Sequence, residues 1–505
     1  MKFLLPIFLL AVLIACRPKT DTPTESSSQS IKPRTIVTTD GEIDDVDSFI
    51  RMLLYANEFR IEGLIYSSSM WHYSGDGKGT EFVSEMEMTQ KMYGAKTDLR
   101  WPGTEWMNPL LDAYESVYPK LSQHAEGFPT ADYLRSLVRV GNIEFEGEME
   151  KDTPGSDFIK EKLLDEDMEP IYLQVWGGTN TIARALKSIE DQYKGTPEWE
   201  AVYQKVSDKA ILYAILDQDA TYRKYISPNW PDLRIFYNSN QFWCFAYSWK
   251  NAVPESQHYL FEGKFMGEEI IDNHGPLLKQ YYSYGDGQKQ EGDDEHIHGD
   301  PTKLENAQWG TFGIYDFISE GDSPAFLHLI DVGLNNLNHP EWGGWGGRLV
   351  QSAEQPNRWE DGKEVLDFSP YKNGLDATYP QVRWLEAIQQ DFAARADWCV
   401  KDYAEANHAP VVKAKGQATR SAKAGESIAL EVEASDPDGN ELETKFWIYR
   451  EVGSYQGEAG LSAAGNQVTV QLPANATGQL HVIAEVKDKT EHPMTRYVRF
   501  VVEVK

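Results

Sequence analysis

Cysteine is scarce in this chain of 505 residues, which contains only 3. Cys16 ends the first apolar run, so Cys244 and Cys399 are the two that remain in the body of the chain. Two cysteines exclude a framework of several disulfide bonds, and the sequence leaves open whether these two pair. The fold must therefore depend on a hydrophobic core, for which 15 Trp, 26 Tyr and 20 Phe provide large side chains.

Basic residues are also few, with 48 Lys and Arg against 79 Asp and Glu, so the formal net charge is -31. A surface of that charge repels phosphates, which excludes nucleic acid as a partner. The charge is compatible with a cation site and with neutral ligands. The many Trp and Tyr rings favour a carbohydrate or small glycoside as the ligand, although most of these rings belong in a core.

Long apolar runs are missing except at the start, where Phe3 to Ile14 is too short to cross a membrane. With Lys2 before it and Cys16 after it, this run predicts a signal peptide over residues 1–16. Leu13 to Cys16 resembles the bacterial lipobox, in which the cysteine carries lipid; the alternative is ordinary cleavage beside a chance cysteine. Residues 17–33 are rich in Ser, Thr, Pro and Lys and predict a disordered tether. We therefore expect an exported bacterial lipoprotein of the cell envelope, on the periplasmic or surface face of the outer membrane, held to the membrane through its N-terminal lipid only.

The body of the chain opens with a strand, a loop, a helix and a second strand between residues 34 and 65. Thr35 to Thr39 is a β-branched run, and Asp47 to Tyr55 has apolar residues at helical spacing. The loop between them contains Asp40, Asp44 and Asp45. Because open α/β sheets bind ligands at the carboxyl ends of their strands, these acids are candidate site residues.

The same alternation of strands and helices continues downstream. Strands are predicted at 171–176, 209–216 and 233–237, each a continuous apolar run followed by a polar turn and a helix. This pattern predicts an α/β domain over 34–403, with a mainly parallel Rossmann-like sheet and helices on both faces. Residues 408–505 alternate apolar and polar side chains between turn signals, which predicts a C-terminal β-sandwich of immunoglobulin-like size.

Three carboxylates within six residues repel one another unless a cation or dense hydrogen bonding offsets their charge. Hard oxygen ligands favour calcium or magnesium. The alternative is helix capping, because an acid before a helix accepts backbone N–H bonds and meets the positive end of the helix dipole.

The opening loop resembles the DxDxGxDD motif of the nucleoside hydrolase superfamily, with Thr38 and Glu42 in place of the first acid and the glycine. Gly177 to Asn180 resembles that superfamily's second site loop. Glu320 to Pro324 resembles its last site loop, with Gly321 where the superfamily has a histidine. Further motifs, among them NHGPL and HPEWGGWGGR, extend the resemblance over nearly the whole chain. The whole chain resembles a bacterial family that has a nucleoside-hydrolase-like domain and a C-terminal immunoglobulin-like domain. Members of this family are called cellulose-binding.

This resemblance implies a calcium site and a role for each residue of that site. Asp45, Asp322 and the backbone carbonyl of Asn180 would be calcium ligands. Asp40 would be both a ligand and the general base, and Asp44 would act in catalysis by binding a sugar hydroxyl. His274 or Asp219 would have to replace the superfamily's histidine in activating the leaving group.

Two functions follow from these assignments. The first is a calcium-dependent hydrolase of glycosidic bonds, in which an N-glycosyl bond or a small glycoside is preferred to a free nucleoside. The second is a non-catalytic carbohydrate-binding lipoprotein that stacks sugars on Trp71, Trp176, Trp342 and Trp345. A catalytic acid opposite the calcium in a closed pocket would favour the enzyme, and an open aromatic platform would favour the binding protein.

Overall fold

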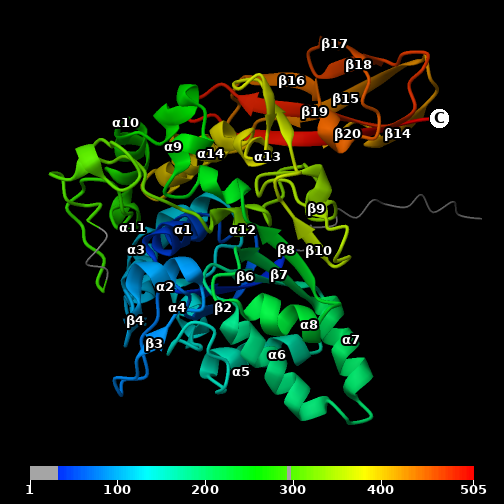
Figure 1. Ribbon diagram of the computed structural model, residues 1–505. Helices are drawn as coiled ribbons and strands as arrows, with labels where there is room; N and C mark the ends of the chain where they lie inside the picture. Colours follow the sequence, from blue (N-terminus) through cyan, green and yellow to red (C-terminus); the bar gives the residue numbers. More distant parts are fainter. Residues whose placement is uncertain (1–31, 293–296) are drawn as a thin grey trace, which may run out of the picture. The chain divides into compact units, whose positions relative to one another are not determined.

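The computed structural model describes residues 32–292 and 297–505 (Figure 1). Cys16, the predicted signal peptide and all but the last residues of the predicted tether lie outside this range. Pro33–Lys505 forms one compact unit. Over 32–292 and 297–505, none of the helices has the length and apolarity that crossing a membrane requires.

The central element is an eight-stranded sheet with the strand order β5-β2-β1-β6-β7-β8-β10-β9. All neighbouring strands are parallel except β9 and β10. The strands are β1 (Arg34–Thr39), β2 (Arg60–Tyr66), β5 (Val138–Val140), β6 (Ile171–Val175), β7 (Ala210–Ile215), β8 (Arg234–Asn238), β9 (Val350–Gln351) and β10 (Arg358–Glu360). The predicted parallel sheet is therefore confirmed.

Helices cover both faces of this sheet, as the continuous apolar strands require. In β1, Ile36 contributes to one hydrophobic cluster and Val37 to the other, because successive side chains point to opposite faces. Figure 1 shows α5, α6 and α7 on one side of the sheet and α1, α3 and α12 on the other. The main helices are α1 (Ile43–Leu54), α2 (Glu87–Tyr93), α3 (Met107–His124), α4 (Ala131–Leu137), α5 (Pro154–Leu164), α6 (Asn180–Tyr193), α7 (Trp199–Lys209), α12 (Ser323–Leu327) and α14 (Leu385–Trp398).

The C-terminal part is the predicted β-sandwich. Its two four-stranded sheets have the orders β13-β15-β18-β17 and β14-β20-β19-β16 and enclose a separate hydrophobic cluster. Its strands are β13 (Val411–Ala414), β14 (Thr419–Ala422), β15 (Ser427–Ser435), β16 (Leu442–Ile448), β17 (Gly460–Ala464), β18 (Gln467–Gln471), β19 (Gly478–Asp488) and β20 (Thr495–Val504). Neighbouring strands are antiparallel, except that β14 and β20 pair in parallel.

The sandwich packs closely on the α/β part. Tyr449 and Tyr497 belong to the large hydrophobic cluster of the α/β part, and the ring centroid of Tyr497 lies 5.3 Å from that of Trp384. Arg496 donates to Asp391 at 2.9 Å in the same region. The two parts therefore share buried side chains. The domain limits 34–403 and 408–505 stay a prediction from the sequence.

Cys244 and Cys399 are both buried, and their thiols are free. Burial raises the pKa of each thiol. They act as small apolar core residues, which answers the question of pairing that the sequence leaves open.

Candidate functional site

Four acids meet at the carboxyl edge of the sheet, as the sequence predicts. Asp40 follows β1, and Asp44 and Asp45 lie in the first turn of α1. Asp322 comes from a loop far along the chain and precedes α12. Asp44, Asp45 and Asp322 each offer an oxygen within 4.8 Å of the others. The hydroxyl group of Thr39, the last residue of β1, donates to Asp45 and fixes its side chain.

The electrostatics of these acids fit a cation. Both carboxylate oxygens of Asp40 are buried without a hydrogen-bond partner. Burial, and then the charges of neighbouring acids, raise the pKa values of Asp44, Asp45 and Asp322 well above the ordinary value. Burial opposes ionisation of Asp40 as well, but His72, with smaller contributions from Ser69 and Asp45, outweighs it and lowers the pKa of that carboxyl group. Clustered carboxylate oxygens that repel one another are the ligand set of a hard cation such as calcium.

Two glycines allow the site loops to approach the acids. A Cβ atom on Gly177 would lie 2.8 Å from Asp40 Cγ, and one on Gly321 would lie 2.7 Å from Asp44 Oδ2. A side chain at position 321, where the superfamily has its histidine, would therefore have to displace the carboxylate of Asp44.

A buried ion pair holds the Asp322 loop against α1. Glu320 and Arg51 are both 0% exposed, with Arg51 Nε 2.5 Å from Glu320 Oε2 and Nη2 2.9 Å from Oε1. Ser323 donates to the same carboxylate at 2.7 Å, and so does the hydroxyl group of Tyr281. The pair links α1, which carries Asp45 in its first turn, to the loop that carries Asp322, so the spacing between these two acids depends on it.

His72 is a site residue that the sequence does not reveal. It lies in the loop after β2, at the same edge of the sheet, and its side chain is 0% exposed. His72 Nδ1 lies 3.5 Å from Asp40 Oδ2 and 3.8 Å from Glu42 Oε2. The other oxygen of Glu42 accepts a hydrogen bond from Tyr247 at 2.9 Å and lies 3.5 Å from Arg100 Nη2. The position after a parallel strand is the one signal that points to His72.

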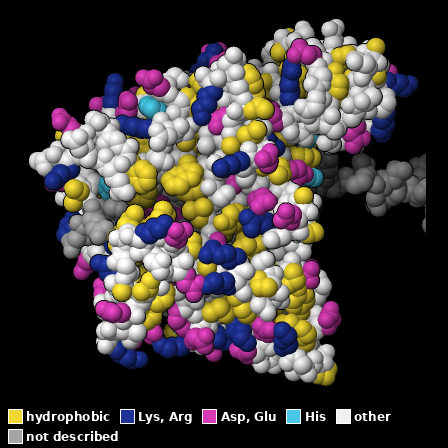
Figure 2. Space-filling view, in the orientation of Figure 1, with side chains coloured by type: hydrophobic (Ala, Val, Ile, Leu, Met, Phe, Trp, Pro, Cys, Tyr) yellow, Lys and Arg dark blue, Asp and Glu magenta, His cyan; other side chains and the backbone are white. Residues whose placement is uncertain are grey.

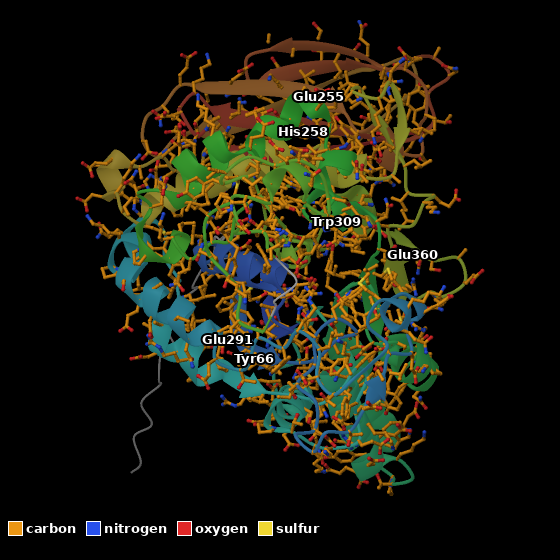
Figure 3. The ribbon with its side chains drawn as sticks, turned by 60° about the vertical axis from the view of Figure 1, so that its left-hand side comes forward. Tyr66, Glu255, His258, Glu291, Trp309 and Glu360 are labelled. Atoms are coloured by element: carbon orange, nitrogen blue, oxygen red, sulfur yellow. The ribbon has the colours of Figure 1, made fainter. Side chains whose placement is uncertain are left out.

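A pocket of about 370 Å³ opens over the acids, within the range of small-molecule sites. Glu42, Asp44 and Asp322 contribute acidic groups to it. Its walls are mostly aromatic and apolar: Met70, Trp71, Met88, Met92, Tyr93, Trp176, Ile215, Leu216, Phe242, Trp243, Ala246, Tyr247 and Trp309. Figure 2 shows hydrophobic side chains gathered over the middle of the visible face. Trp309, labelled in Figure 3, is 36% exposed and stacks on Tyr247 with ring centroids 6.2 Å apart.

Comparison with known proteins identifies the family. Residues 34–349 match the family model described as "Cellulose-binding Sde182, nucleoside hydrolase-like domain". The chain belongs to this family. Residues 427–504 match a second model, described as "Cellulose-binding protein Sde0182, C-terminal domain". The two models thus cover most of the α/β part and most of the sandwich. No curated protein matches the chain in sequence.

A solved structure supports the same assignment. It is described as a nucleoside hydrolase-related hypothetical protein from Saccharophagus degradans that is associated with carbohydrate metabolism. It shares 28% sequence identity with this chain at a TM-score of 0.67, over 94% of this chain and 100% of the other. An effector protein and a plant nucleoside hydrolase, each 10% identical with TM-scores of 0.37 and 0.32, are too distant to carry an argument.

In this member of the Sde182 family, Asn180 and Asp219 hold the loops together. The backbone N–H of Asn180 donates to Asp219 Oδ2 at 2.8 Å, and its side-chain amide donates to Ser68 Oγ and to the Asn142 carbonyl, each at 2.9 Å. Asp219 is buried and does not line the pocket, where its neighbour Gln218 lies instead. Burial, reinforced by the charge of Asp217, raises the pKa of Asp219 to about 6. Asp219 therefore holds the start of α6 in place. The prediction that Asp219 contacts the substrate is corrected, because its side chain does not line the pocket. The role of the Asn180 carbonyl as a ligand stays a prediction.

The predicted role of His274 needs correction. Its Nε2 atom lies 3.4 Å from Asp397 Oδ1 in α14, and the residue is not among those that line the pocket. The NHGPL motif forms the start of a short helix, α11 (Gly275–Leu278), that contacts α3. A local motif could not show that this helix packs away from the acids. The described lining of the pocket contains no histidine.

The four predicted aromatic contacts divide into two pairs. Trp71 and Trp176 line the pocket as predicted. Trp345 is 0% exposed, and the guanidinium of Arg496 lies 5.8 Å from the centre of its ring. Trp342 contacts His481 of the sandwich, with ring centroids 4.8 Å apart. The prediction that Trp345 binds sugar is corrected, because its ring is fully buried. The ring of Trp342 is half-buried, and its contact with sugar stays a prediction.

Proposed function

We propose that the pocket binds a carbohydrate beside a calcium ion and hydrolyses the glycosidic bond of a small glycoside. The observation that carries this proposal is the group of buried acids beneath a pocket with aromatic walls. Asp45 and Asp322 would hold the calcium together with Asp40. Bound calcium would supply positive charge that makes a nearby water molecule easier to deprotonate and attracts sugar hydroxyl groups.

The chain's own acids have distinct tasks in this scheme. Asp40 accepts the proton of the attacking water, because its lowered pKa keeps it ionised and both of its oxygens are buried without a hydrogen-bond partner. Asp44 contributes to the pocket surface and accepts a hydrogen bond from a sugar hydroxyl. The faces of Trp71 and Trp309 contact the apolar side of the sugar ring, which orients it over the acids.

Leaving-group chemistry limits the substrate. A nucleobase needs a proton as it departs, and the described lining of the pocket contains no histidine to donate one. We therefore propose that good substrates carry a leaving group that departs without protonation or is protonated by solvent. Aryl glycosides have that property, whereas unmodified nucleosides do not.

An activity screen with and without calcium tests the proposal. The panel contains nitrophenyl ribosides and glucosides, inosine and cello-oligosaccharides. We expect release of nitrophenol that stops on chelation, and inosine as a poor substrate. Asp40→Asn should lower kcat about 100-fold or more without weakening sugar binding to the same extent. The matched control is Asp217→Asn, another buried acid, whose partner is Arg223 at 2.9 Å outside the pocket; it should leave kcat unchanged.

A second candidate function is carbohydrate binding without catalysis. It is favoured by the same lack of a histidine in the described pocket lining and by the cellulose-binding description of the family. Calorimetry with the same panel separates the two. Binding of cello-oligosaccharides with no turnover of any glycoside would establish the binding protein and refute the hydrolase. If the protein neither binds nor hydrolyses any compound of the panel, both candidate functions are refuted.

A further inference from the structure

A second group of metal-binding side chains lies beside the acids that we assign to calcium. Asp40, Glu42 and His72 each offer one ligand atom within 4.8 Å of the others. Neither ring nitrogen of His72 has a hydrogen-bond partner, although the side chain is 0% exposed. Buried polar groups nearly always have partners, so an imidazole turned toward two carboxylates without a hydrogen bond points to a bound cation.

The separations fit a coordination sphere better than a hydrogen bond. His72 Nδ1 lies 3.5 Å from Asp40 Oδ2 and 3.8 Å from Glu42 Oε2. An N–H···O hydrogen bond spans about 2.7–3.2 Å. Ligand atoms about 2.1 Å from a tetrahedral ion lie about 3.4 Å from one another. An ion at the centre of this group therefore needs only small shifts of the three side chains.

The ligand atoms that the side chains offer distinguish this group from the neighbouring group of acids. Asp44, Asp45 and Asp322 offer oxygen alone, which suits calcium. Asp40, Glu42 and His72 combine carboxylates with an imidazole, which suits zinc and related divalent ions. We propose that Asp40, Glu42 and His72 bind a zinc-type divalent cation beside the calcium site. Three protein ligands leave one position open toward the pocket that Glu42 lines, as in catalytic zinc sites.

The surrounding residues hold the group ready for an ion. The backbone N–H of His72 donates to Ser69 Oγ at 3.2 Å, and its carbonyl accepts from the Ser69 N–H at 2.9 Å, so a tight turn fixes the imidazole. Tyr247 and Arg100 hold Oε1 of Glu42, which leaves Oε2 facing His72. These contacts orient the ligands as outer-sphere partners do in known metal sites.

Charge also favours a second ion. The two groups bring together five carboxylates, and the guanidinium near them is that of Arg100. Arg100 and a single divalent cation together leave two of the five negative charges unbalanced in a buried place, which is costly. A second divalent cation removes the imbalance. The proposal does not depend on hydrolysis, because it concerns binding alone.

Zinc titration of the calcium-saturated protein tests the proposal. We expect wild type to bind one zinc ion while it retains its calcium, measured by calorimetry and by elemental analysis after dialysis. His72→Asn should weaken zinc binding more than about 100-fold, since loss of an outer partner alone costs 10–100-fold. Its calcium-dependent rise in melting temperature should be unchanged. His258→Asn is the control: this histidine bonds the Val253 carbonyl at 3.0 Å, lies outside the pocket lining (Figure 3) and should leave zinc binding intact.

Two further variants keep the test decisive. His72→Cys retains a zinc ligand and should still bind cobalt, with the charge-transfer absorption of a thiolate that wild type lacks. Asp45→Asn should lose calcium but keep zinc. Equal zinc affinity in wild type and His72→Asn, or displacement of calcium by zinc one for one, would overturn the proposal. Failure of glycoside hydrolysis would leave these binding results untouched, so the two proposals fail separately.

Discussion

Replacement of Arg51 by methionine would leave the carboxylate of Glu320 buried without its counter-charge. Both side chains are 0% exposed, and two N–H groups of Arg51 donate to Glu320. Breaking a buried pair on one side typically costs about 3–5 kcal/mol, because the remaining charge is desolvated and unpaired. We expect Arg51→Met to lower the free energy of unfolding by about that amount. It should also weaken calcium binding, since Glu320 positions the loop of Asp322.

Urea unfolding followed by tryptophan fluorescence measures the first effect, and calcium titration measures the second. The double variant Arg51→Met with Glu320→Gln should recover much of the lost stability, because no buried charge is left unpaired. Arg135→Met is the control, since Arg135 pairs with the exposed Asp112 and should cost less than about 1 kcal/mol. A loss below about 1 kcal/mol in Arg51→Met, or no recovery in the double variant, would refute the reasoning.

Three further predictions concern other parts of the chain. In Gly321→Ala, the added Cβ would lie 2.7 Å from Asp44 Oδ2 and displace the carboxylate that we assign to a sugar hydroxyl, so we expect sugar affinity to fall about 10-fold by calorimetry. Gly374→Ala, with its nearest atom at 3.8 Å, is the control, and equal sugar affinities in the two variants would contradict us. Burial raises the pKa of Glu146 from 4.5 to about 7, so the folded chain keeps a proton that the unfolded chain releases. The free energy of unfolding that this group contributes therefore falls as pH rises from about 4.5 to 7. In urea unfolding, Glu146→Gln should raise the free energy of unfolding by about 1–2 kcal/mol at pH 8 and leave it unchanged at pH 4. A gain that does not depend on pH would disprove the assignment. Cys16 should be the lipidated N-terminus in mass spectra of membrane-extracted protein, and an unmodified chain that starts elsewhere would exclude this.

The strands that build the site could be predicted because each is an apolar run with a polar turn at its end. The residues after β1 and the turn after β6 lie where this pattern places them. Strand β5 (Val138–Val140) was missed, because its three residues continue the helical spacing of α4. So short a strand is identified only by the neighbour with which it pairs.

Side-chain roles were harder to predict than loop positions. A Trp has the same sequence signal whether it faces a sugar or a neighbouring domain, so Trp345 could not be distinguished from Trp71. The role of His72 depends on which way the loop after β2 turns, and no local pattern encodes that. Gly321 was identified as lacking the histidine, but the close approach of Asp44 to that position is visible only in three dimensions.

Calcium-dependent melting tests the central claim most directly. A cation that binds only the folded state stabilises it by about 2.7 kcal/mol at a hundredfold excess over the dissociation constant. We predict that chelation lowers the melting temperature of wild type and that calcium restores it. Asp45→Ala should not respond, and Asp44→Ala should keep most of the response while it loses sugar binding. An unchanged wild-type melting curve after chelation, with no calcium in the purified protein, would contradict the calcium site and the hydrolase mechanism that rests on it.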